Sequence, residues 1–444
     1  MTSTFNEQLQ CVLLLGGQGR RLGLSDLPKP MVDVAGQPLL ARVLTHLRAQ
    51  GLRRFVCLVN HLEDVLRGHF GNGASWDVEI TWISDPGGRG TAGATVNAAD
   101  ALENEFLMVY GDLLFDIDVA RFVTAARAAG GQGTIMVHPN SHPIDSDLVQ
   151  LAPRSGTNER TDPITGFLRK PRPPEAVHRN MASAGIYHLS KSALADVPRT
   201  MDQPDWGRDF FPRAVARGAH YSGYRTIEYV KDIGTPDRLQ KALADLDAGR
   251  PAHRSYRAPQ PAVFLDRDGV INREIDGVTC AHDLHLLPGA AEAIAKLNAA
   301  GLPVILATNQ PGVAKGFLSL DELDEIHAHL DAQLAAEGAF LDDRYVCIHH
   351  PECGHPGERA HLKIDCTCRK PKGGLMRMAA QDHNLDLSRS VMVGDRDVDM
   401  AAVTSVGGRG VRVASNGENP PGHAGHIDAL DLAEAVDTLL GQWP

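Results

Sequence analysis

The sequence predicts an α/β fold with two domains, and three observations support this. The chain has 444 residues, which is about three times a typical domain length and accommodates two large α/β units. Short apolar runs alternate with helical patterns, which indicates mostly parallel sheets. The segment GRPAHRSYRAPQP, rich in proline and arginine, interrupts this alternation. We therefore expect a first domain over residues 1–249, a linker over 250–261 and a second domain over 262–444.

The composition excludes several protein classes. The chain is 43% hydrophobic and 22% charged, without low-complexity tracts or repeats, as in globular proteins. No apolar run approaches the roughly 18 residues of a membrane span, and the first ten residues are polar, so we expect a cytoplasmic protein without membrane contact. A net charge of −11 argues against nucleic acid as a partner. Seven cysteines, an odd number, argue against a disulfide framework.

The apolar runs place the expected strands. The helical stretch before the linker is expected to end at Gly249, and the prolines of 249–261 argue against a helix or an inner strand there. Ligands of open α/β sheets bind at the carboxyl ends of strands, so the loops after these runs should carry the function. The expected strands are 11–15, 55–59, 78–83, 106–110, 134–138, 183–188 and 224–229 in the first half, and 262–265, 303–307, 344–348, 390–393 and 410–413 in the second.

The loop after the first expected strand combines glycines with cations. Gly16, Gly17 and Gly19 would let backbone N–H groups approach an anion that a Cβ would hold away. Arg21 and Lys29 would add positive charge over a triphosphate. A purely structural turn would also explain the glycines alone, and the P-loop pattern does not occur in the sequence.

The wider sequence resembles the sugar-1-phosphate nucleotidyltransferase family. LLLGGQGRRLGLSDLPKPMVDVAGQPLL matches the opening of that family, and GTAG, YGD and DIGTP follow in the family's order. The resemblance implies a Rossmann-like sheet, an NTP and a sugar 1-phosphate as substrates, and in-line attack on the α-phosphorus without a protein nucleophile. It also implies a loop around the base at Gly90 and Thr91, and Mg²⁺ on Asp112 and Asp232.

Two positions depart from the family pattern. Arg169-Lys170-Pro171 stands where the family often has Glu-Lys-Pro, and SAGIY at 183–187 where it has Asn-x-Gly-Ile-Tyr. Lys170 and Gly185 keep their places, and Lys170 is expected to bind the sugar phosphate. The changes at Arg169 and Ser183 predict an unusual sugar or one with extra negative charge. The acidic stretch GDLLFDID resembles the heptose 1-phosphate guanylyltransferase branch, which favours GTP and leaves ATP, CTP and UTP open.

The first strand of the second domain runs into DRDG. Two carboxylates two residues apart at a strand end can share one Mg²⁺ and divide the chemistry. Asp266 would attack phosphorus to form an aspartyl-phosphate, and Asp268 would protonate the leaving oxygen and then activate water. This pattern resembles the haloacid-dehalogenase (HAD) superfamily, whose later motifs appear in order.

That resemblance assigns roles to residues further along the chain. Asp397 and Asp399 are interpreted as supporting charges or as charges at a helix N-terminus. The resemblance implies phosphoryl binding by Thr308 and Asn309, charge neutralisation by Arg369 and Lys370, and a third Mg²⁺ carboxylate at Asp395.

A cluster of cysteines and histidines indicates a second kind of metal. Cys347-x-His349 and Cys366-x-Cys368 form two close pairs across a long loop, the pattern of a closed, structural zinc site. Unrelated thiols remain the alternative, and the surplus residues Cys353, His350, His355 and His361 could compete for the ion. The pattern resembles the zinc loop of heptose 1,7-bisphosphate phosphatases and histidinol phosphatases. The long loop and the sequences CIHHP and DCTCRKP favour the heptose branch.

The two resemblances together imply a bifunctional enzyme of activated-heptose synthesis. Removal of the 7-phosphate from D-glycero-D-manno-heptose 1,7-bisphosphate would supply the sugar 1-phosphate that the first domain uses, and the product would feed surface polysaccharide assembly such as lipopolysaccharide. Open alternatives are another sugar bisphosphate, another NTP and a histidinol-phosphatase-like second domain. A catalytically dead binding module in place of one domain is disfavoured, and the oligomeric state stays open. The carboxylates that argue against a dead module are Asp112, Asp232, Asp266, Asp268 and Asp395.

Overall fold

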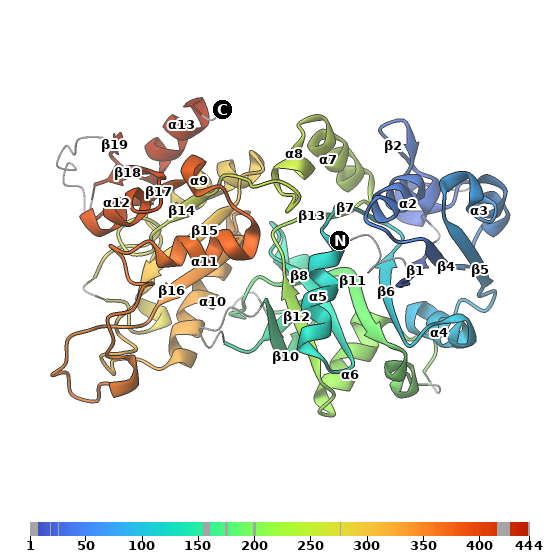
Figure 1. Cartoon of the computed structure of the whole chain (residues 1–444), viewed down its shortest axis with the longest axis horizontal. Coiled ribbons are helices and arrows are strands. Elements are labelled where there is room, and N and C mark those ends of the chain that lie inside the picture. The colour runs from blue at the N-terminus through green and yellow to red at the C-terminus, as the bar shows by residue number, and fades with distance from the viewer. Residues whose placement is uncertain are drawn as a thin grey trace.

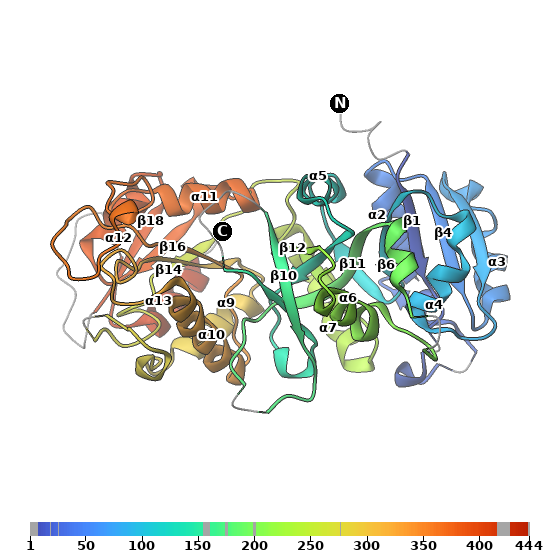
Figure 2. The same ribbon diagram turned by 90° about the horizontal axis from the view of Figure 1, so that it is seen from below.

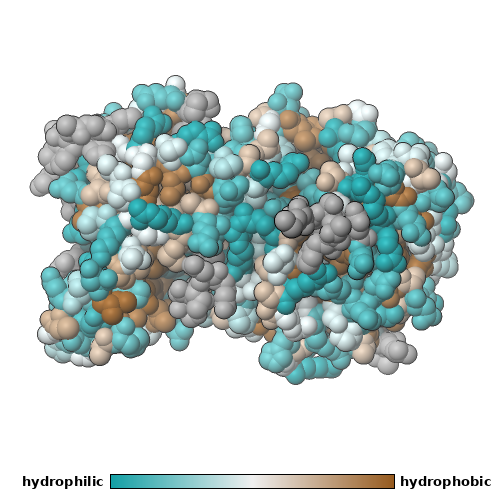
Figure 3. Space-filling view, viewed as in Figure 1, coloured by the Kyte–Doolittle hydropathy of each residue, from teal (hydrophilic) through white to brown (hydrophobic). Residues whose placement is uncertain are grey.

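Two sheets organise the two halves of the molecule, which lie side by side (Figure 1). The computed structural model describes residues 8–17, 19–24, 26–153, 160–173, 176–198, 201–275, 277–414 and 427–442. No described helix combines the length and the apolar character that a membrane span requires. On the face shown in Figure 3, hydrophobic residues lie in small groups among hydrophilic ones.

The N-terminal half contains a mixed nine-stranded sheet. Strands β5, β4, β1 and β6 are parallel to one another, and β12 is parallel to β8. Strand β11 is antiparallel to both of its main neighbours, and β10 is antiparallel to β9 and β12, so the parallel prediction holds only in part. In spatial order the strands are β5 (Glu79–Ser84), β4 (Arg54–Val59), β1 (Gln10–Leu14), β6 (Glu105–Tyr110), β11 (Ala182–Ser190), β8 (Gly133–His138), β12 (Tyr221–Arg225), β10 (Thr161–Leu168) and β9 (Leu148–Leu151).

Helices cover both faces of this sheet because β1 is apolar on both. Cys11 and Leu13 of β1 point into one core, and Val12 and Leu14 point into another. The first core holds α2 (Leu39–Ala49), α3 (Glu63–Phe70) and α5 (Val119–Ala129), and the second holds α4 (Gly90–Asn97) and α6 (Phe211–Ala216).

A separate antiparallel pair joins β7 (Leu113–Asp116) to β13 (Tyr229–Asp232). The predicted strand 224–229 is wrong, because it spans the break between β12 and β13. Ile227 lies in this break and packs into a core of the C-terminal domain, which takes the chain out of the sheet. Short β2 (Asp33–Val34) and β3 (Gln37–Pro38) form a further pair, and α7 (Pro236–Asp247) follows β13.

The C-terminal half contains a six-stranded sheet whose strands are parallel, as predicted. All five strands predicted here are confirmed to within about two residues, and the sixth, β19, was not predicted. Helices α9 (Ala290–Ala299), α10 (Leu320–Ala336) and α13 (Leu432–Gln442) pack into one core, and α11 (Gly374–His383) and α12 (Asp397–Thr404) into another. The strand order is β16 (Asp343–Cys347), β15 (Val304–Asn309), β14 (Val263–Leu265), β17 (Val391–Gly394), β18 (Arg409–Val413) and β19 (Ile427–Ala429).

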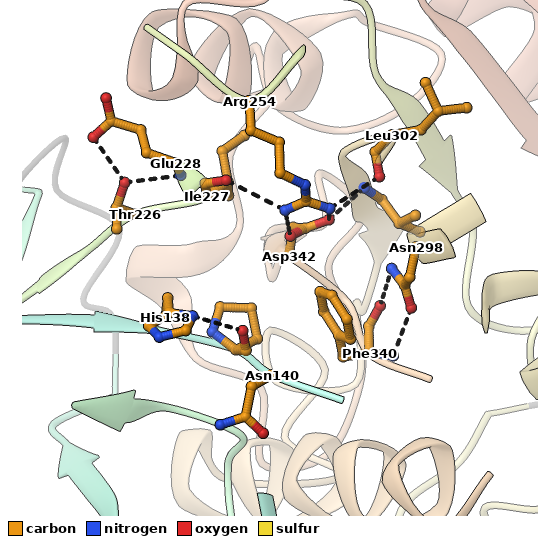
Figure 4. A network of polar contacts seen from close by, with 12 residues as sticks. His138, Asn140, Thr226, Ile227, Glu228, Arg254, Asn298, Leu302, Phe340 and Asp342 are labelled. Carbon is orange, nitrogen blue, oxygen red and sulfur yellow. Dashed lines mark hydrogen bonds and ion pairs between the residues drawn. The ribbon is translucent and has the colours of Figure 1, made fainter. Parts of the chain in front are cut away.

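The segment between the sheets differs from the predicted linker. Helix α7 ends at Asp247, and Gly249, two residues further on, adopts the left-handed conformation expected near a helix C-terminus. Residues Arg250–His253 then form the short helix α8. Pro251 fits there because the first turn of a helix does not use its N–H groups. Arg254 then ties both domains together through Ile227 and the buried carboxylate of Asp342 (Figure 4). The segment is therefore docked between the domains.

Candidate active sites

The strand pair β7–β13 brings together the two carboxylates predicted to bind Mg²⁺ in the first domain. Asp232 lies opposite Leu113, the residue after Asp112. The backbone N–H of Ile233 donates to the carbonyl oxygen of Asp112 at 3.0 Å. Asp112 and Asp232 are thus neighbours in the fold, although they are distant in sequence.

Cations converge on this pair of carboxylates. The Nζ of Lys29, a buried side chain, donates to Asp112 at 2.5 Å. A Cβ on Gly234 would lie 2.7 Å from an oxygen of Asp232, 2.8 Å from the Lys29 Nζ and 3.5 Å from the Arg21 guanidinium. Glycine at 234 therefore allows these charged groups to approach the backbone more closely than any side chain would permit. The carboxylates of Asp112 and Asp232 supply the hard oxygen ligands that Mg²⁺ prefers.

Arg238 is a further cation that the sequence analysis missed. Its guanidinium pairs with Asp232 from the first turn of α7. The side-chain hydroxyl of Thr235 accepts a hydrogen bond from the backbone N–H of Arg238 and caps the N-terminus of this helix. The sequence did contain a signal for this position, because Thr235-Pro236 is typical of a helix start. Residue 238 then lies in the first turn of that helix, beside the strand that ends at Asp232.

The glycine loop lies next to Lys29. A Cβ on Gly17 would be 3.8 Å from the Lys29 side chain, and Gly19 has a positive φ of 64°. Gly16 faces Asn60 at the end of the neighbouring strand β4. Gln18, the remaining residue of this motif, lies outside the described residues.

Gly90 and Thr91 begin helix α4, where a loop was expected. A Cβ on Gly90 would be 2.5 Å from the carbonyl of Gln203, so only glycine fits this approach. The hydroxyl of Thr91 donates to Asp205 at 2.7 Å. Gly185, with φ of 72°, packs beside Leu113 and Tyr110 at the end of β6. These residues therefore surround the same strand ends as Asp112.

Lys170 lies apart from this group. Its Nζ donates to the carbonyl oxygen of Asp145 at 2.5 Å and its side chain is exposed. No contact described in residues 160–173 joins Lys170 to Asp112 or Asp232. Arg169 lies 3.9 Å from Asp209.

The nearby acidic residues Asp116 and Asp118 have structural roles. Asp116 pairs with Arg257 of the interdomain segment, and Asp118 caps α5.

The second domain gathers three buried carboxylates, two of which pair with Lys370. Ligand oxygens of Asp266, Asp395 and Asp399 lie within 4.8 Å of one another. Lys370 contacts Asp266 at 2.9 Å and Asp399 at 2.6 Å. Burial raises the pKa of Asp266 to about 6 despite the charge of Lys370. Asp397 and Asp399 lie in the first turn of α12, as predicted, but Asp399 also belongs to the acidic group itself. Such a set of hard oxygen ligands fits Mg²⁺.

Asp268 has a different environment from these carboxylates. The fully buried Arg267 donates to it from Nε at 3.1 Å and from Nη2 at 3.0 Å. Asn272 and Gln310 donate to it at 3.0 and 2.8 Å. Burial acts to raise the pKa of Asp268, but the Arg267 charge and these hydrogen bonds outweigh burial and lower it. Neither Arg267 nor Gln310 was predicted as its partner.

The predicted phosphate-binding residues flank this centre. Gln310 donates to the Thr308 hydroxyl at 3.0 Å. Asn309 exchanges two hydrogen bonds with the backbone of Lys370, which joins the ends of two motifs. Arg369 donates to the carbonyl oxygen of His349 at 3.4 Å and so connects the phosphatase centre to the cysteine cluster.

The four predicted zinc ligands form one cluster. The sulfur atoms of Cys347, Cys366 and Cys368 lie 3.2 to 3.6 Å apart, and the His349 Nδ1 lies 3.3 Å from Cys368. A disulfide would need about 2.05 Å between sulfur atoms, whereas thiolates about 2.3 Å from one zinc ion stand about 3.8 Å apart in a tetrahedron. The spacing therefore fits a shared metal ion. Cys353 is outside the cluster and exposed.

Comparisons with known proteins agree with the division of the chain into two domains. Residues 10–249, more than half of the chain, match the nucleotidyl transferase family, and residues 367–439 match a HAD-hydrolase-like family. The D-glycero-D-manno-heptose-1,7-bisphosphate 7-phosphatase of Thermosynechococcus vestitus is 43% identical over 191 residues, 41% of this chain and 96% of that protein. The chain belongs to both families. It is a bifunctional enzyme, with a nucleotidyltransferase domain and a HAD-type phosphatase domain.

Other relatives resemble the nucleotidyltransferase domain. The mannose-1-phosphate guanylyltransferase of Mycobacterium tuberculosis is 28% identical over 260 residues, 57% of this chain and 69% of that protein. The structure of HddC from Yersinia pseudotuberculosis complexed with GMP-PN is 24% identical, covers 54% of this chain and 100% of that chain, and has a TM-score of 0.45.

Proposed function

We propose that the chain makes a nucleotide-activated heptose in two consecutive steps. The phosphatase domain hydrolyses the 7-phosphate of D-glycero-D-manno-heptose 1,7-bisphosphate, and the nucleotidyltransferase domain transfers a nucleotidyl group, from GTP, to heptose 1-phosphate. The observation that carries this proposal is the 43% identity of this chain to a heptose bisphosphate phosphatase over 96% of that protein's length. The same chain also contains a nucleotidyltransferase domain, for which we propose a sugar 1-phosphate as substrate. The domains extend over residues 1–249 and 262–444, with the docked segment 250–261 between them.

In the phosphatase domain, the Asp266 carboxylate attacks the 7-phosphorus and the sugar hydroxyl leaves. Asp268, whose lowered pKa keeps it ionised in the free site, takes up a proton when the anionic phosphate binds beside it, because the added negative charge favours its neutral form. It gives this proton to the leaving oxygen and then accepts a proton from the water that hydrolyses the aspartyl-phosphate. Mg²⁺ held by Asp266, Asp268 and Asp395, with Asp399 beside Asp266 and Asp395, would neutralise phosphoryl charge. Thr308, Asn309, Arg369 and Lys370 orient the phosphoryl group.

In the nucleotidyltransferase domain, the sugar 1-phosphate attacks the α-phosphorus of the NTP and pyrophosphate leaves. Asp112 and Asp232 would hold Mg²⁺, which neutralises phosphate charge when bound. Lys29 and Arg21 stabilise the charge that moves onto pyrophosphate, and the backbone of Gly16, Gly17 and Gly19 binds the phosphates. Gly90 and Thr91 bind the base, while Gly185 and Lys170 bind the sugar phosphate; Lys170 exchanges its bond to Asp145 for this contact.

The cysteine cluster holds a structural zinc ion that fixes the long loop and takes no part in catalysis. None of the seven cysteines, all of which lie within the described residues, forms a disulfide, as expected of a protein in a cytoplasmic, reducing location.

The two-site proposal is tested by separating the activities. Asp266→Asn should abolish phosphate release from the bisphosphate but keep pyrophosphate release from a supplied heptose 1-phosphate and GTP. Asp112→Ala should do the reverse. If either substitution removed both activities in a folded chain, the two-site assignment would be wrong.

A further inference from the structure

The nucleotidyltransferase domain contacts helix α10 of the phosphatase domain through buried charge. Asn180 donates its backbone N–H to Asp331 at 3.0 Å. The neighbouring Arg179 pairs with Asp324, and its Nε lies 3.4 Å from Asp331. Figures 1 and 2 place α10 on the side of its domain that faces the other domain. The two contacting residues precede β11, so they are held by the nine-stranded sheet.

Asp331 also contacts a residue in the interior of the phosphatase domain. Arg344 on β16 donates to both of its carboxylate oxygens at 2.6 Å, and both side chains are buried. Arg344 also donates to the carbonyl oxygen of His327 at 3.3 Å, one helical turn before Asp331. The position of α10 therefore depends on charges from both domains.

His327 in turn contacts the catalytic loop. Its Nε2 lies 3.5 Å from Nη1 of Arg267, the residue that holds Asp268 with two nitrogens. Burial and the charges of Arg267, Arg344 and Arg179 hold the pKa of His327 well below its usual range. The imidazole is thus neutral and accepts the Arg267 N–H. A continuous series of polar contacts joins Arg179 to Asp268.

We propose that Arg179 is a positioning residue for the phosphatase reaction, although it belongs to the nucleotidyltransferase domain. By holding α10 through Asp331 and Asp324, it keeps His327 against Arg267 and so fixes the carboxylate of Asp268. This role rests on the proposed acid and base function of Asp268. Docking of the first domain would thereby tune the chemistry of the second.

The test uses the full chain with Mg²⁺ and two substrates, the heptose bisphosphate and p-nitrophenyl phosphate, a probe that needs no sugar pocket. Arg179→Met should lower kcat for both by about 3- to 30-fold at unchanged KM, and Arg179→Lys should recover part of it. The matched control is Arg121→Met. Arg121 also crosses the domain boundary, with hydrogen bonds to the carbonyls of Gln381 and Asp382 at 3.0 Å, and no contact among the described residues joins it to α10. This control should keep kcat.

A double-mutant cycle separates positioning from general destabilisation. With His327→Leu already in place, Arg179→Met should lower kcat by a much smaller factor. Equal kcat losses in Arg179→Met and Arg121→Met, or independent multiplication of the Arg179 and His327 effects, would overturn the inference. A wild-type chain that hydrolyses neither substrate would instead overturn the proposed phosphatase function.

Discussion

A Cβ on Gly269 would lie 2.7 Å from the carboxyl carbon of Asp395, so Asp395 occupies the space that any other residue at 269 would need. Gly269→Ala should displace the acidic centre and lower phosphatase kcat by about 100-fold, with nucleotidyl transfer unchanged. Gly338→Ala is the matched control, because Gly338 has a similar φ of 73° and a Cβ there would have no described heavy atom within 4 Å. A full loss of phosphate release in the control as well would show that backbone strain alone is responsible.

Lys29 provides the buried positive charge beside Asp112. Lys29→Met should lower kcat for nucleotidyl transfer by about 100-fold or more, measured as pyrophosphate release, while phosphate release from the bisphosphate stays unchanged. Lys191→Met is the control in the same domain, since within the described part of the chain the Lys191 Nζ donates to the carbonyl of Leu102 and to no group of the candidate site. Retained nucleotidyl transfer in Lys29→Met would remove this residue from the site.

The cysteine cluster should hold one zinc ion per chain. Cys366→Ser should lose that zinc, measured by elemental mass spectrometry, and should lower the thermal midpoint because the long loop loses its fixation. Cys353→Ser should keep the zinc, since Cys353 lies outside the cluster. Equal zinc content in the two variants would contradict the ligand set.

Stability should depend on pH through Glu228, which lies between the domains. Burial raises its pKa to about 8 from an ordinary value of 4.5. The folded chain binds this proton more tightly than the unfolded chain, so the group's contribution to stability falls as pH rises from about 4.5 to about 8. Glu228→Gln should therefore gain in thermal midpoint over the wild type across this range and keep a constant advantage above it. A constant difference from pH 5 to pH 9 would contradict the shifted pKa.

The sequence correctly predicted the strands whose side chains pack within their own domain. The strands of the C-terminal domain were found because central strands of parallel sheets are apolar on both faces. The prediction at 224–229 failed because Ile227 packs into the other domain, and the linker prediction missed α8 because Pro251 suits a first helical turn. The Ile227 contact is tertiary and no local pattern encodes it, whereas α8 follows from a local preference, proline in the first turn of a helix, that the interpretation of the prolines as breakers overlooked.

The residues of the candidate sites were predicted from the sequence, whereas several contacts between them were not. Motif order located Asp112, Asp232, Asp266 and the cysteine cluster, because strand ends and spacing are visible in sequence. The hydrogen bonds from Arg267 to its neighbour Asp268 could not be predicted, because they depend on the direction that the buried Arg267 side chain takes. The contact of His327 on α10 with Arg267 could not be predicted, because these residues are distant in sequence.

The most direct test of the central claim is a mass-spectrometric product assay. The full chain, Mg²⁺ and each anomer of heptose 1,7-bisphosphate are incubated with GTP, ATP, CTP or UTP in separate reactions. The account predicts GDP-heptose from GTP and one anomer, with release of both phosphate and pyrophosphate. Phosphate release without any nucleotide sugar would contradict the coupled pathway, and no phosphate release from either anomer would contradict the heptose substrate itself.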